Sequence, residues 1–145
     1  MHILAKAGGT QSAGALEQTL VDLAQVVSDP TPKLILADEL EAITEPGAGA
    51  RIIAGMLLAA RAQKDTSMML VTHLAPAIVK ASGCNDLRVD GIEARGLDAN
   101  LELIVDRNPI RNHLAKSTPE LIVKRLVERS DGGAKTLFSD ILNMF

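Results

Sequence analysis

The chain is poor in aromatic residues, in cysteine and in long apolar runs. Its 145 residues include two Phe and no Trp or Tyr, which argues against a protein that stacks nucleic-acid bases on aromatic rings. The single cysteine, Cys84, excludes an intrachain disulfide and a cysteine-based metal cluster, and it fits a reducing cytoplasm. No apolar run approaches the ~20 residues of a membrane span, and no basic segment with an apolar stretch opens the chain. We therefore expect a cytoplasmic protein with no membrane partner and no signal peptide.

The chain also has no excess of positive charge and no phosphate-binding loop. Its formal net charge is −3, so no overall positive field attracts DNA or an anionic membrane. No Gly-x-x-x-x-Gly-Lys-[Ser/Thr] segment is present. The stretch Gly132-Gly133 before Lys135-Thr136 has the wrong spacing, because four residues should separate the two glycines and a strand should precede them. The basic residues Arg107, Arg111, His113 and Lys116 are either a solvated loop or a contact to phosphate or nucleic acid.

Aliphatic residues supply what the core needs, and their spacing predicts an α/β fold. Hydrophobic residues make up 47 % of the chain, enough for one folded domain. The spacing predicts a short strand at 2–5, a helix over 13–27, a strand over 34–37, a helix over 46–64, a strand over 68–72 and a short helix over 75–81. The strand at 34–37 is apolar on both faces, as in a parallel sheet covered by helices. Alternating helices and strands favour parallel strands with a right-handed crossover.

The last third of the chain has a different pattern. Residues 87–94 and 101–105 alternate between apolar and polar residues, which predicts an antiparallel pair at the edge of the sheet. Ser117 and Glu120 fit a capping box that opens a helix to about Arg129, and residues 135–145 predict a final amphipathic helix. We expect one lobe over residues 1–116 and a C-terminal helical segment over 117–145.

Asp38 and Glu39 directly follow the first apolar strand, and His73 follows the next. The carboxyl ends of parallel strands meet at one edge of a sheet, where ligands bind. There Asp38 can hold Mg²⁺, directly or through water, and Glu39 can orient an attacking water. The alternative interpretation is structural: a charged pair that closes a strand, and a histidine that serves the fold.

Ser12 stands directly before the first long helix. The free amides and the dipole of a helix N-terminus favour an anion, so Ser12 can belong to a phosphate site. It can equally be a simple N-cap serine.

The order of these motifs resembles the C-terminal lobe of an ABC-type ATPase, and within that superfamily the MutS family of DNA mismatch-repair and recombination ATPases, especially its MutS-like paralogues. Residues 12–17 are similar to the signature segment, with Glu17 five residues after Ser12. Residues 34–39 resemble Walker B, and residues 40–49 resemble the D-loop region, including Thr44-Glu45-Pro46 followed by Gly49. Residues 71–73 resemble the strand with the switch histidine. The resemblance covers about residues 5–129.

The resemblance implies a site for ATP and Mg²⁺ at the interface between two ATPase lobes. Asp38 would help to position Mg²⁺, Glu39 would activate water, and His73 would sense the γ-phosphate. Ser12, with Gly14 beside it, would contact ATP that a second ATPase lobe or a homodimer partner holds. ATP binding and hydrolysis would be coupled to DNA, which regions outside this chain would bind.

Several residues depart from the family pattern. Glu41 and Ile43 stand where glycines are expected in the D-loop region, and Ser12-Ala13-Gly14 replaces the expected Ser-Thr-Phe. Walker A is absent, so we expect an ATP hydrolase only as part of an intact domain and negligible hydrolysis by this chain alone. Two alternatives stay open: the C-terminal lobe of a chromosome-maintenance or recombination-repair ABC-type ATPase, and a decayed, non-catalytic dimerisation module.

A lobe without its N-terminal strands would expose apolar sheet surface and an unpaired edge. We therefore expect association with a separately encoded N-terminal half or with a second copy. The C-terminal helices could supply such a contact through one apolar face, although the same face could pack on the chain's own sheet. Its residues are Leu137, Phe138, Ile141, Leu142 and Phe145.

Overall fold

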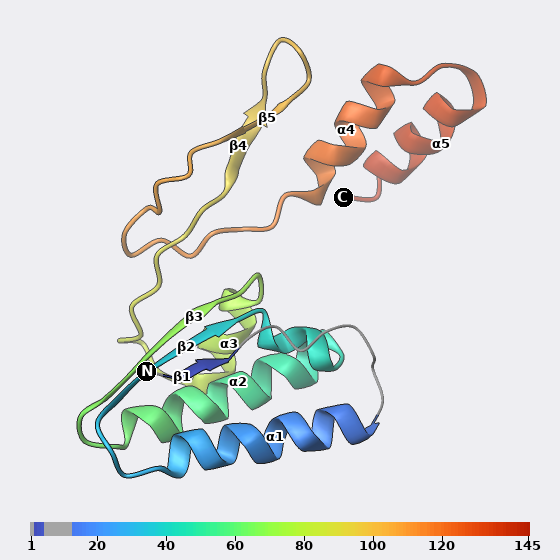
Figure 1. The fold of residues 1–145 in the computed structure, drawn as a ribbon. Coiled ribbons are helices and arrows are strands. Elements are labelled where there is room, and N and C mark those ends of the chain that lie inside the picture. The colour runs from blue at the N-terminus through green and yellow to red at the C-terminus, as the bar shows by residue number, and fades with distance from the viewer. Residues whose placement is uncertain (1, 5–12) are drawn as a thin grey trace. The chain divides into compact units, whose positions relative to one another are not determined.

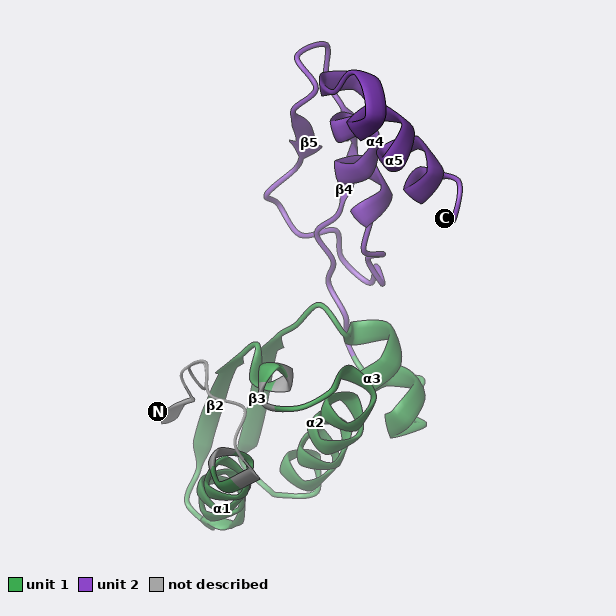
Figure 2. Cartoon of the chain, turned by 90° about the vertical axis from the view of Figure 1, so that its right-hand side faces the viewer, with its two compact units in different colours: residues 1–87 green, residues 88–145 purple. Residues whose placement is uncertain are grey.

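The computed structural model describes residues 2–4 and 13–145, which form two compact units (Figure 2). Unit 1 covers residues 1–87 and unit 2 covers residues 88–145. The boundary lies well before the predicted one at 116/117. The reason is that the antiparallel strands belong with the C-terminal helices and not with the parallel sheet.

Unit 1 is a three-stranded parallel sheet with helical crossovers (Figure 1). The strands are β1 (His2–Leu4), β2 (Lys33–Asp38) and β3 (Thr66–Val71), in the order β1-β2-β3. Helix α1 (Ala13–Ser28) connects β1 to β2, and the 3₁₀ helix η1 (Leu40–Ile43) and α2 (Pro46–Arg61) connect β2 to β3. Helix α3 (Ala75–Ser82) follows β3. The predicted parallel α/β pattern is confirmed for these elements.

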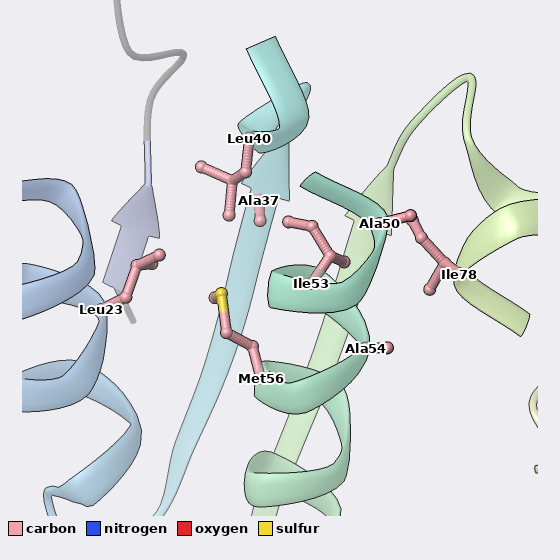
Figure 3. Packing of buried hydrophobic residues seen from close by; sticks show 8 residues of the cluster. All are labelled: Leu23, Ala37, Leu40, Ala50, Ile53, Ala54, Met56 and Ile78. Carbon is pink, nitrogen blue, oxygen red and sulfur yellow. The ribbon is translucent and has the colours of Figure 1, made fainter. Parts of the chain in front are cut away.

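The core of unit 1 lies between the sheet and helices α1 and α2, which run along the same face of it (Figure 1). Leu23 of α1, Ala37 of β2 and Ile53 of α2 are buried in one cluster, with Ile78 of α3 at its far end (Figure 3). All of its members are aliphatic residues or methionine. Close packing and buried apolar area therefore stabilise the unit without aromatic rings. The prediction that β2 is buried on both faces is wrong, because burial alternates along β2 and β3.

A buried lysine closes the end of the sheet opposite the acid pair. Lys33, the first residue of β2, is 7 % exposed. Its Nζ donates hydrogen bonds to the backbone oxygens of Asp29 and Thr31 and to Gln63 Oε1. Gln63 in turn donates to the backbone oxygen of Val27, near the end of α1. The charge is thus satisfied by carbonyl groups, as burial requires, and it ties the end of α1 to the loop before β3.

Unit 2 contains a separate two-stranded sheet and a helical hairpin. Strands β4 (Ala94–Leu97) and β5 (Leu103–Val105) are antiparallel, and helices α4 (Pro119–Arg129) and α5 (Gly132–Leu142) pack together. The antiparallel pair is therefore confirmed, but its placement at the edge of the parallel sheet is wrong. Asp98 Oδ1 accepts the N–H groups of Asn100 and Glu102 at 2.8 and 2.9 Å, which fixes the hairpin turn.

The boundaries of the unit 2 elements correct three further expectations. The first strand begins at Ala94, where it was expected to end. Helix α4 has Thr118 at its N-cap, with no side-chain cap bond, so Ser117 and Glu120 do not form the predicted capping box. Helix α5 starts at Gly132, so the glycine pair opens this helix instead of separating it from α4. Its predicted apolar face is partly open, since Leu137 is 56 % exposed and Phe145 69 %.

Carboxylates hold the segments that lead into and out of the β4–β5 hairpin. Gly91 and Ile110 exchange two backbone hydrogen bonds. Glu93 Oε2 accepts the N–H of Lys116 at 3.1 Å, and Glu93 Oε1 lies 3.0 Å from His113 Nε2. The Lys116 N–H and, second, the His113 side chain hold the pKa of Glu93 below its usual range. The Arg88 guanidinium and the N–H of Asn112 lower the pKa of Asp90 in the same way.

Acidification is expected to destabilise unit 2 through Glu93 and Asp90. Both carboxylates have a lower pKa in the folded state than in the unfolded state. Their stabilising effect is therefore complete above the unfolded pKa and is lost as the pH falls towards the folded pKa. Urea unfolding from about pH 6 to about pH 3 should show a smaller loss of stability for Glu93→Gln than for the unchanged chain. Glu128→Gln, on the exposed surface of α4, is the control, and equal pH profiles for all three proteins would contradict this assignment.

Candidate functional site

The carboxyl ends of β2 and β3 lie side by side, and the predicted acid pair and histidine follow these ends. Asp38 is opposite Val71 in the parallel register. The N–H of Glu39 donates to the backbone oxygen of Val71 at 3.0 Å, one step beyond the strand. His73 follows Val71 by two residues, so the topology brings all three to the same edge of the sheet. Asp38 and His73 are exposed and Glu39 is half-buried.

Glu39 marks the point where the backbone leaves the sheet. Its φ is +45°, in the left-handed region that costs a residue other than glycine about 1–2 kcal/mol. Its backbone oxygen accepts the N–H of Ala42 at 3.1 Å within η1. The turn thus starts directly after Asp38. Both the backbone N–H and the backbone oxygen of Glu39 are hydrogen-bonded there. Outliers of this kind are concentrated at functional sites.

His73 lies in a turn that a hydrogen bond to the side chain of Thr72 stabilises. Thr72 Oγ1 accepts the N–H of Leu74 at 2.9 Å, a local turn that a hydroxyl side chain can form. The backbone oxygen of Leu74 then accepts the N–H of Ile78, which is 2 % exposed and packs in the core. His73 is therefore held between strand β3 and the anchored start of α3.

Glu45 has a structural task that the sequence analysis missed. Its carboxylate accepts the N–H of Gly47 at 3.0 Å and that of Ala48, and it is the N-cap of α2 with Pro46 at the first helical position. An acidic residue directly before a proline that opens an apolar helix was the available signal. Thr44-Glu45-Pro46 thus sets the start of the helix that crosses from β2 to β3.

The remaining predicted residues are described only in part. Ser12 lies outside the described residues. Gly14 is exposed in the first turn of α1. The backbone at Glu41 and Ile43 forms η1. The functional roles of Ser12, Gly14, Asp38, Glu39 and His73 stay predictions. The same holds for the nucleic-acid interpretation of the basic stretch around Arg107 and Arg111, which lies in unit 2.

The exposed carboxylate at the strand edge is compatible with Mg²⁺ that is bound together with phosphate. Within residues 2–4 and 13–145, no group of three or more His, Cys, Asp or Glu could hold a metal ion. Asp38 offers one exposed carboxylate. Mg²⁺ keeps several waters and is commonly bound by one or two carboxylates together with substrate phosphates, which a single aspartate at an open edge allows.

No helix in the described part of the chain is long and apolar enough to cross a bilayer.

The described chain is a small mixed α/β protein whose parallel sheet presents two acids and a histidine at one edge. Its sequence is 45 % identical over 133 residues to the DNA-binding protein MutS2 of Pyrococcus furiosus. The match covers 92 % of this chain and 23 % of that protein, so the chain spans about a quarter of the relative's length. No protein-family model matches, and no solved structure does. The chain is therefore homologous to a part of MutS2, and the resemblance to the MutS family is confirmed.

Replacing Glu45 by alanine is expected to destabilise unit 1 by about 1 kcal/mol, the usual cost of removing an N-cap acceptor. The physical reason is that the N–H groups of Gly47 and Ala48 lose their partner. Urea unfolding followed by circular dichroism measures the change. Glu17→Ala, on the exposed side of α1, is the matched control and should change the free energy of unfolding by less than about 0.5 kcal/mol. Equal effects of the two substitutions would contradict the capping role.

Proposed function

We propose that the edge of β2 and β3 is one wall of an ATP-hydrolysing site, and that this chain acts as the C-terminal part of a MutS2-type ATPase. The observation that carries the proposal is the parallel register, which sets Asp38 opposite Val71 and leads directly into Glu39 and His73. An acid pair and a histidine at adjacent strand ends suit phosphoryl transfer, because that reaction needs charge stabilisation and a positioned water. Homology to a part of MutS2 supports the same assignment.

Each residue has a distinct task in this proposal. Asp38 holds Mg²⁺ directly or through water, and the ion supplies neutralisation of the phosphate charge. Glu39 accepts a hydrogen bond from the attacking water and orients it towards the γ-phosphorus. His73 donates a hydrogen bond to the γ-phosphate. Gly14 in the first turn of α1, and Ser12 just before that helix in the sequence, contact ATP held by a second lobe.

The proposed site needs a partner. The chain carries no Gly-x-x-x-x-Gly-Lys-[Ser/Thr] loop, and such a loop supplies the backbone N–H groups that cradle the phosphates. In this proposal the phosphate loop comes from polypeptide outside residues 1–145, in the same protein or in another subunit. ATP would then join the two lobes and hydrolysis would release them. DNA would be bound by that larger assembly and not by this chain.

The isolated chain is expected to bind Mg-ATP very weakly and to hydrolyse none measurably. Most contacts to the phosphates are missing without a phosphate loop. Isothermal titration of the chain with Mg-ATP checks this, with ADP and Mg²⁺ alone as controls. A micromolar affinity in the absence of a partner would contradict the proposal that the site is shared.

In a complex with a chain that carries the phosphate loop, Glu39→Gln should retain ATP yet slow turnover by about two orders of magnitude or more. The amide can no longer act as a base for the attacking water. Glu45→Gln is the matched control, since this neighbouring acid caps α2 and should leave turnover within about two-fold. Single-turnover hydrolysis with labelled ATP separates binding from chemistry. An unchanged rate for Glu39→Gln would remove Glu39 from the mechanism and favour a non-catalytic module.

A further inference from the structure

Two hydrogen bonds bracket the backbone of His73 at the carboxyl edge of the sheet. On one side, the backbone oxygen of Val71 accepts the N–H of Glu39 at 3.0 Å. On the other side, Thr72 Oγ1 accepts the N–H of Leu74 at 2.9 Å. The second bond closes a ring that contains the φ and ψ dihedrals of His73. The hydroxyl of Thr72 therefore limits the backbone conformations of that one residue.

The acceptor and the donor of this ring-closing bond are both held in place. Leu74 is half-buried and packs against the core cluster that contains Ile53 and Ile78. Its backbone oxygen accepts the N–H of Ile78 at 3.0 Å. Thr72 is β-branched, so its χ1 has fewer accessible rotamers than that of an unbranched residue. The ring around His73 is thus stiff on the side of Thr72 and anchored in the core on the side of Leu74.

The start of helix α3 does not depend on this bond. An N-cap side chain accepts a hydrogen bond from the second or third helical residue, whereas Thr72 accepts from Leu74, which is itself the N-cap residue of α3. The first turn of α3 is closed by the bond from Ile78 to Leu74. His73, the residue inside the ring, is exposed at the strand edge. The ring therefore orders a residue of the candidate site, and this favours a task in that site.

We propose that Thr72 is a positioning residue for the reaction at this edge: its hydroxyl fixes the backbone of His73 so that the imidazole meets the γ-phosphate. The inference rests on the proposed function, since it needs a reacting phosphate beside His73. Thr72 touches no reacting atom in this scheme and acts only through His73. Misplacement of a reacting group by about 1 Å can cost about a hundred-fold in rate, so the loss of one backbone constraint is large enough to measure.

Thr72→Val tests the inference in the complete ATPase, which contains both this chain and the phosphate loop. Valine keeps the β-branched shape and removes the acceptor. We expect kcat for ATP hydrolysis to fall about ten-fold or more. The KM for ATP should stay within about two-fold, because the phosphate loop supplies most contacts to the phosphates. Thr72→Ser keeps the hydroxyl and should retain kcat within about three-fold.

Thr66→Val is the matched control, because it makes the same substitution at the other end of β3. Thr66 is half-buried, as Thr72 is, and its replacement should leave kcat within about two-fold. Circular dichroism and urea unfolding check that the variants fold. Where Thr72→Val does not fold, Thr72→Ala removes the same acceptor with a smaller side chain and takes its place in the comparison with serine.

A double-mutant cycle separates positioning from a general structural effect. Because Thr72 acts through His73, Thr72→Val should lower kcat by less than about two-fold once His73 is replaced by alanine. Three results would overturn the inference and leave the proposed role of His73 in place: an unchanged kcat for Thr72→Val, a loss that serine does not rescue, or the same loss in the His73→Ala background. An unchanged kcat for His73→Ala would overturn the proposed role of His73 and the positioning role with it.

Discussion

The parallel pairing of β2 with β3 is the constraint on which the rest of unit 1 depends. Its six-residue register aligns Lys33 with Thr66 at one end and Asp38 with Val71 at the other. One set of alternate residues is thereby turned into the core against α1 and α2, and the other set is turned outwards. The same register decides which polar residues meet at the carboxyl edge. A shift by one residue would bury Asp38 and expose Ile35 and Ala37, at a cost that the core could not sustain.

Unit 2 is stabilised in a different way. No residue of α4 or α5 is buried, and the hairpin is joined to α4 by Glu102, which pairs with Arg125 and Arg129. Exposed ion pairs contribute little individually to stability. The fold of unit 2 is therefore determined more by backbone geometry than by these ion pairs. Gly91 shows this clearly, because a Cβ there would lie 2.6 Å from the backbone oxygen of His113. Only glycine allows the two segments to approach so closely.

Much of unit 1 could be predicted from the sequence, and less of unit 2. Long periodic segments such as α1 and α2, and strands that end in acids, carry strong local signals. Parallel topology then placed Asp38, Glu39 and His73 at one edge. The sequence predicts exposed apolar sheet surface but not which side chains form it, because Leu34 and Met69 are as apolar as the inward-facing residues beside them. In unit 2 the carboxylates of Asp98 and Glu93 bond to backbone groups several residues or a whole hairpin away. Those bonds help to set where β4 begins, and the alternation of apolar and polar residues does not predict them.

The left-handed backbone at Glu39 bears on how this chain varies during evolution. A position with φ of +45° is one where glycine or asparagine is the natural resident. Drift alone would move the sequence towards those residues, since each such change relieves the backbone. A glutamate at this corner therefore carries a backbone cost that glycine would not. Comparison of relatives at this single position would show which of them keep a carboxylate there.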